Sequence, residues 1–120
     1  MNKTATFTLT ALLSSWSIVD AIEMCNPSPI SVESPPPEKP NLRLPTSVSG
    51  YALLEYTVTE QGNVTNVELI QAYAPPEVPG LTASFALAAI AAVKNWKYEP
   101  VEASCRVRKK LSFSIEKGGA

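Results

Sequence analysis

The stretch Phe85-Ala-Leu-Ala-Ala-Ile-Ala-Ala-Val-Lys-Asn-Trp-Lys-Tyr-Glu-Pro100 decides the fold. Proline cannot continue a helix and disfavours helix just before itself, so we expect the helix to end at Tyr98-Glu99-Pro100. Thr82 or Ser84 can cap its start. Apolar residues recur here at helical spacing and share one face: Leu81, Phe85, Ala88, Ala89, Ala92, Val93 and Trp96.

Two strands are expected before this helix. In the first, Ala52, Leu54, Tyr56 and Val58 alternate with more polar residues, which is typical of a half-buried strand. A turn at residues 60–63 follows, because glycine at position 62 can adopt a positive φ. The second strand covers residues 64–72. Its apolar residues do not alternate strictly, which predicts a bulge or twist: Val64, Val67 and Leu69.

A last strand is expected from Arg106 to Ile115, and Lys109 interrupts its inward-facing stripe. That stripe consists of Val107, Leu111, Phe113 and Ile115. Placing it beside the first strand gives an all-antiparallel sheet in the order 2-1-3, covered on one face by the helix. The predicted class is therefore α+β, a two-layer β-β-α-β fold. We expect its core to contain Leu54, Tyr56, Val58, Phe85, Ala89, Val93, Trp96, Tyr98, Pro100, Leu111 and Phe113.

These segments together resemble the TonB C-terminal domain family. The similarity covers residues 42–116, with Leu44-Pro45 where the family usually has Tyr-Pro and Ala86 where an acidic residue is common. The helix-to-proline stretch is the specific part. The resemblance is carried by Gly50-x-Ala52-x-Leu54-x-Tyr56-x-Val58, Gln61-Gly62-x-Val64 and Phe85-x-x-Ala88-Ala89-Ile90-x-Ala92-Val93-x-x-Trp96-x-Tyr98-x-Pro100.

The resemblance implies a periplasmic module that receives a short peptide, the TonB box, from an outer-membrane receptor. In that family the peptide adds as a strand to a sheet edge, and the last strand is an edge in the predicted order. Cationic residues on this strand are candidates for attracting acidic residues of the partner; alternatively they protect the edge from aggregation. They are Arg106, Arg108, Lys109 and Lys110.

Residues 1–21 have the features of an export signal, with a lysine before an apolar run and small or branched residues before a cleavage site after Ala21. An uncleaved membrane anchor is the main alternative, and only then do we expect membrane contact. Asp20 and Glu23 shorten the run below the roughly 20 apolar residues of a spanning helix. Lipoprotein processing at Cys25 is disfavoured by the larger residues that precede it.

The chain has two cysteines, Cys25 and Cys105. In an oxidising compartment we expect them to pair, which stabilises the fold by about 4–5 kcal/mol in the chain-entropy model; unpaired thiols or a bridged dimer are the alternatives. Residues 22–41 are rich in proline and form either a plain linker or an arm lying on the domain. The domain itself is expected at residues 42–117, with a frayed tail at 118–120.

Composition limits the remaining function classes. A net charge of −1 gives no general case for nucleic acid, and the absence of histidine removes His-based catalysis and metal sites. No nucleophile, phosphate or metal motif is present, so we expect no enzyme, no cofactor and no metal. Glu99 and Glu102 are interpreted as solvated loop residues.

Two hypotheses on function therefore stay open, and both end in protein binding. The first is a TonB-like adaptor for an outer-membrane receptor peptide, linked to TonB-dependent transport. The second is a secreted stand-alone domain that binds another periplasmic protein and is not coupled to energised import. A missing histidine-bearing anchor and a short spacer distinguish the chain from the family's energised transducers. The oligomeric state does not follow from the sequence.

Overall fold

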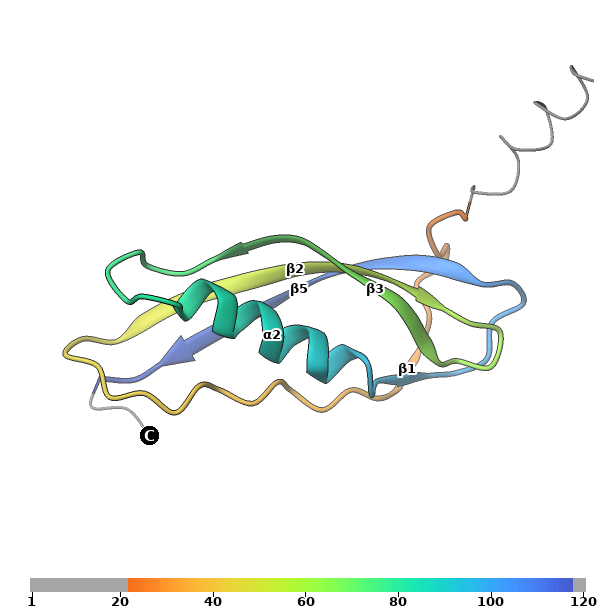
Figure 1. The fold of residues 1–120 in the computed structure, drawn as a ribbon. Helices are drawn as coiled ribbons and strands as arrows, with labels where there is room; N and C mark the ends of the chain where they lie inside the picture. The colour runs from red at the N-terminus through yellow and green to blue at the C-terminus, as the bar shows by residue number, and fades with distance from the viewer. Residues whose placement is uncertain (1–21, 118–120) are drawn as a thin grey trace, which may run out of the picture.

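The computed structural model describes residues 22–117 (Figure 1). The expected export signal at 1–21 and the expected tail at 118–120 lie outside these residues. The described elements are β1 (Ser31–Glu33), β2 (Val48–Val58), β3 (Val64–Tyr73), α2 (Leu81–Val93), β4 (Lys97–Tyr98) and β5 (Cys105–Ile115).

The main sheet has three strands in the order β3-β2-β5, and both pairings are antiparallel. This confirms the α+β class with an antiparallel sheet and a helix. The expectation of a single sheet is wrong, because β1 and β4 form a second, two-stranded antiparallel sheet. The second sheet could not be expected from periodicity, since its strands are too short to alternate visibly.

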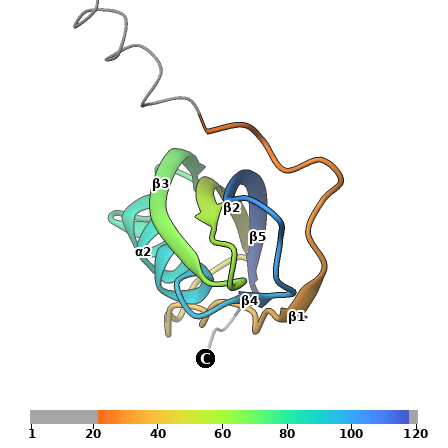
Figure 2. The ribbon, with the colours of Figure 1, turned by 90° about the vertical axis from the view of Figure 1, so that its right-hand side faces the viewer.

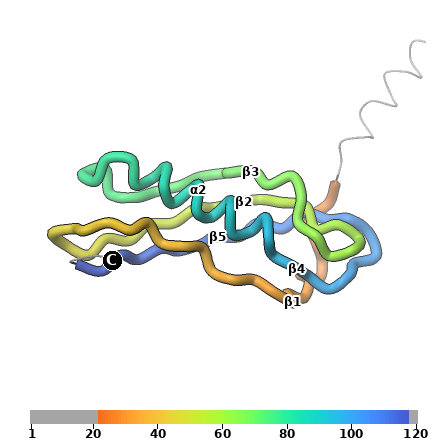
Figure 3. Tube along the Cα trace, turned by 60° about the horizontal axis from the view of Figure 1, so that its bottom comes forward, coloured from red at the N-terminus to blue at the C-terminus, as the bar shows by residue number. Residues whose placement is uncertain are grey.

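The helix and the proline-rich stretch share one face of the main sheet. Residues 26–45, here called the arm, pass along the domain beside α2 before entering β2 (Figure 2, Figure 3). Leu42 and Leu44 of the arm pack against the core. Within the arm, β1 pairs with β4 and so lies on the domain.

The core lies between the sheet and this mixed layer. All the predicted core residues except Pro100 are buried. The Phe85 and Phe113 rings stack at 4.4 Å between centroids, which joins the helix to β5. Gly50 is needed where the layers meet, because a Cβ there would overlap the carbonyl oxygen of Tyr73 and lie 2.7 Å from the Phe85 ring.

The helix differs from its prediction at both ends. It begins after Gly80, which has a φ of 78° and offers no side-chain cap, rather than at a cap on Thr82 or Ser84. It ends at Val93, and the amides of Asn95 and Trp96 then bond three residues back instead of four. Trp96 therefore follows the helix instead of belonging to it.

Extended pairing explains the early end of the helix. The Tyr98 N–H donates to the Gly62 carbonyl at 2.9 Å, and the Glu99 N–H donates to the Ile30 carbonyl at 2.8 Å. These bonds satisfy in a β conformation the backbone groups that a longer helix would have used. Pro100 is exposed, so its placement in the core was wrong.

The expected irregularity of the second strand is confirmed. Leu53 pairs with Gln71 whereas Leu54 pairs with Leu69, so β3 contains an extra residue there. A second register shift lies near Asn66, which has a φ of 52°. Each extra residue bends the strand and breaks the alternation of its side chains.

Candidate partner-binding edge

The backbone bonds of Arg106 show which N–H and C=O groups of β5 point away from β2. Its N–H donates to the Glu23 carbonyl at 2.9 Å, and its C=O accepts from the Cys25 N–H at 2.8 Å, so both groups point away from β2. In an antiparallel strand, successive residues direct these groups to opposite sides. Pairing with β2 continues without a shift to Ile115. The later outward groups therefore belong to Arg108, Lys110, Ser112 and Ser114.

The outward groups beyond Arg106 have no backbone partner in the described part of the chain. Within residues 22–117, the pairing with β2 accounts for every backbone hydrogen bond of residues 107–115. Unpaired N–H and C=O groups at regular spacing along an edge are what an added strand requires. The predicted edge is thus open over most of its length.

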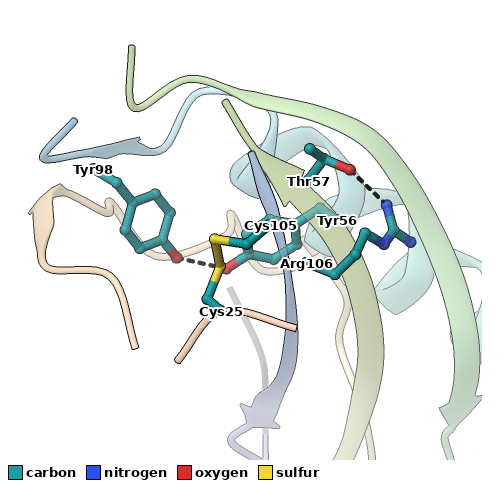
Figure 4. Close-up of a disulfide and its surroundings, with 6 residues drawn as sticks. All are labelled: Cys25, Tyr56, Thr57, Tyr98, Cys105 and Arg106. Carbon is teal, nitrogen blue, oxygen red and sulfur yellow. Dashed lines mark hydrogen bonds between the residues drawn. A yellow bond between two sulfur atoms is a disulfide. The ribbon is translucent and has the colours of Figure 1, made fainter. Parts of the chain in front are cut away.

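The first position of this edge is closed by the chain itself. Met24 forms a parallel bridge with Arg106. A Cys25–Cys105 disulfide, with Cα atoms 4.9 Å apart, covalently joins this N-terminal segment (residues 22–25) to β5 (Figure 4). The predicted disulfide is confirmed. The predicted edge is not free at Arg106, where the segment already occupies the strand position.

A groove of 510 Å³ borders the open part of the edge. The arm forms one wall and β5 the other, with β4 between them. The Trp96 indole N–H donates to the Pro35 carbonyl at 2.8 Å and holds the arm in place. The groove combines apolar side chains with a cationic side chain and lies next to the unpaired backbone groups of β5. Its lining includes Pro36, Trp96, Tyr98, Val107, Lys109 and Leu111.

A pair of buried hydroxyl groups supports the base of this groove. The Tyr56 and Tyr98 hydroxyl oxygens lie 2.6 Å apart (Figure 4). Burial, followed by its hydrogen bond with the Tyr98 hydroxyl, raises the pKa of the Tyr56 hydroxyl far above its usual range. Tyr56 therefore stays neutral, and the bonded pair of hydroxyl groups joins β2 to β4.

The side chain of Arg106, a predicted binding residue, is already bonded to other residues of the domain. Its guanidinium bonds to Glu55 at 3.1 Å, to the Thr57 hydroxyl at 3.0 Å and to the Asn66 carbonyl at 3.0 Å. It also pairs with Glu68. Only 10% of the side chain is exposed. This side chain links all three strands on the face opposite the helix, so its charge is largely compensated before any partner arrives.

The other three predicted cations are exposed and differ in their contacts. Arg108 bonds to Glu55 at 2.9 and 3.2 Å, and the Lys110 ammonium lies 4.5 Å from the centre of the Tyr51 ring. Lys109 lines the groove. No carboxylate of residues 22–117 lies within ion-pair distance of Lys109 or Lys110.

Glu55 shares one carboxylate between two guanidinium groups. Hydrogen bonds from Arg108 and then Arg106 lower the pKa of Glu55, and they outweigh the opposing effect of burial. The ionised form is therefore favoured when the sheet is formed. This cluster stabilises the face of the sheet that carries no helix.

The sequence left open whether the proline run is a plain linker or an arm lying on the domain, and it gave no indication that this stretch forms a groove wall. One signal was available: pairing of Cys25 with Cys105 places the start of the arm beside the last strand. The contact of Trp96 with Pro35 had no such signal, since prolines carry no side-chain hydrogen-bonding group.

The part of the chain that the structure describes contains no group of three or more potential metal ligands. Among the same residues, no helix is both long and apolar enough to cross a membrane. The disulfide indicates an oxidising, exported environment. Comparison of the chain with protein-family models and with curated proteins finds no match.

Proposed function

We propose that this chain is a periplasmic TonB-like domain that binds an extended peptide segment of an outer-membrane receptor by strand addition. The single observation that supports this most is the regular row of unpaired outward groups on β5, from Arg108 to Ser114. A partner that lies in the periplasm meets the domain in the same oxidising compartment as the disulfide.

Strand addition needs no catalytic group. The outward N–H and C=O groups recognise any extended chain through its backbone, while the flanking groove accepts alternate side chains. Lys109 and Lys110 have no carboxylate partner within residues 22–117 and attract acidic residues of the incoming segment. The domain acts by binding, and transport is the role that its resemblance to the TonB family adds.

A second candidate is a secreted interaction domain that binds another periplasmic protein without a link to energised import. The arm favours this alternative. Its β1 strand pairs with β4, and its Pro35 carbonyl bonds to Trp96, so this part of the proline-rich stretch does not serve as a free spacer. A transducer of the TonB type requires a spacer with reach.

The test of strand addition is a titration of the full exported chain with synthetic peptides that cover the N-terminal segments of outer-membrane receptors. Fluorescence anisotropy of labelled peptide reports binding. Ser112→Pro removes an outward N–H and places a ring at the edge, while leaving the bonds to β2 intact. We expect affinity to fall at least tenfold, whereas the control Ser112→Ala binds as the original chain does.

Two results would contradict the proposal. One is a folded Ser112→Pro variant that binds a receptor peptide as tightly as the original chain. The other is the absence of binding by every receptor peptide. A pull-down from an outer-membrane extract separates the candidates: capture of a receptor supports the first, and capture of a soluble periplasmic protein alone supports the second.

A further inference from the structure

The N-terminal segment occupies the kind of position that a partner strand would take. Glu23 and Cys25 bond to both outward groups of Arg106, in the parallel orientation. Cys25 is also joined through its disulfide to Cys105, the residue of β5 before Arg106. An incoming strand is therefore confined to the stretch that begins at Arg108.

Little besides the disulfide holds this segment in place. Ile22 and Met24 are 47% and 50% exposed, and Glu23 is exposed. The net gain from two backbone hydrogen bonds is comparable to the cost of ordering one or two residues. Pairing alone therefore leaves the segment near balance, and the covalent bridge to Cys105 decides that it stays.

We infer that the Cys25–Cys105 disulfide is a redox latch that sets the length of the peptide-binding edge. This inference rests on the proposed function and adds its regulation. With the bridge intact, the outward groups at Arg106 belong to the chain's own segment. When the bridge is broken, the segment leaves, and the outward N–H and C=O groups of Arg106 become available to the peptide.

The opening reaction is a thiol–disulfide exchange with a dithiol reductant, such as a periplasmic thiol oxidoreductase. One reductant thiolate attacks a sulfur of the bridge and forms a mixed disulfide, which releases the other cysteine as a thiol. The second reductant thiol then attacks the mixed bond. Both cysteines gain a proton and an electron, and the reductant becomes a disulfide. Cys25 and Cys105 are each partly exposed, which gives a reductant access.

The first readout is amide hydrogen exchange at Arg106, which needs no peptide. We expect the Arg106 N–H to exchange at least tenfold faster in the dithiothreitol-reduced chain than in the oxidised chain. The inward-pointing amide of Val107 serves as the internal reference and stays protected. The latch is wrong if Arg106 remains as protected as Val107 in a reduced chain that is still folded.

A second variant covers the case in which the reduced chain unfolds. Two glycines inserted between Met24 and Cys25 keep the bridge but move Glu23 away from the Arg106 N–H. Exchange at Arg106 must then rise without loss of the disulfide. Phe85→Leu is the control for general weakening, because Phe85 packs on Phe113, toward the other end of β5 from Cys105, and its substitution leaves the ratio of Arg106 to Val107 exchange unchanged.

The second readout is affinity for the receptor peptide of the titration above. Reduction opens one further pair of outward groups, so we expect binding to tighten about fivefold to thirtyfold. Faster exchange at Arg106 with unchanged or weaker peptide affinity would refute control of the site. If no peptide binds in either state, the proposed function fails, and the exchange data still decide whether the segment is released.

Discussion

The two edges of the main sheet differ in regularity. β5 pairs with β2 through an unbroken register from Cys105 to Ile115, whereas β3 contains two register shifts and a residue at positive φ, Asn66. An added strand needs outward groups at constant spacing, which β3 does not offer. Irregularity of this kind protects an edge from pairing with another chain. Because β5 has no such irregularity, its edge can pair with an added strand.

The largest expected effect comes from removing the covalent closure of β5. The double variant Cys25→Ser, Cys105→Ser should lose about 2–5 kcal/mol of unfolding free energy, because the bridge no longer restricts the unfolded chain. Urea denaturation of the oxidised chain and of the variant measures the difference. A loss below about 1 kcal/mol would mean that the segment and β5 are held together by other contacts.

A matched pair of prolines tests the alternation on which the open edge depends. Lys109→Pro removes an N–H that points to β2 and should cost about 3 kcal/mol. Lys110→Pro removes an outward N–H, and edge strands tolerate this, so its cost should stay below about 1 kcal/mol. Thermal unfolding compares them. Equal costs, or the reverse order, would contradict the assignment of outward residues.

The irregular edge has its own test at Asn66. Asn66→Val should cost about 1–2 kcal/mol, because a β-branched side chain is strained at positive φ. Asn66→Gly should be close to neutral, since glycine adopts this conformation readily. Chemical denaturation of both variants provides the measurement. Neutrality of the valine variant would indicate that β3 is straighter than described and that the two edges are more alike.

The smallest expected effect is on how the unfolding free energy changes at acidic pH. The lowered pKa of Glu55 means that its ionised form stabilises the fold above the ordinary glutamate value. That contribution disappears as the pH falls through the lowered pKa. Between pH 5 and pH 2, Glu55→Gln should therefore show a shallower loss of stability than the original chain. Glu102→Gln, an exposed control, should keep the original slope; equal slopes for all three would exclude Glu55 as the source.

The main sheet could be predicted from the sequence because its information is local. The alternation in β2 and the inward Leu111 and Phe113 of β5 indicate strands from neighbouring residues alone. The turn at Gly62 likewise indicates from local sequence where β2 ends. The helix end could not be predicted in the same way. The Tyr98 N–H bonds to Gly62, a partner remote in the chain, and this pairing overrode the helical pattern around Trp96.

For the candidate edge too, one part could be predicted from the sequence and another could not. That the last strand lies at an edge followed from the order of elements. The orientation of its backbone groups did not, because it depends on the register in which β5 pairs with β2. The burial of the Arg106 charge among Glu55 and Glu68 likewise depends on side chains from three strands.

The contact between Trp96 and the arm has an optical consequence. The sequence contains two tryptophans, Trp16 and Trp96, so a chain that starts at residue 22 carries a single indole. In the folded domain this ring is 5% exposed, and its N–H is bonded to the Pro35 carbonyl. If the arm lifts, water reaches the ring and its fluorescence emission moves to longer wavelength. The protein thus carries its own spectroscopic reporter of whether the groove wall is closed.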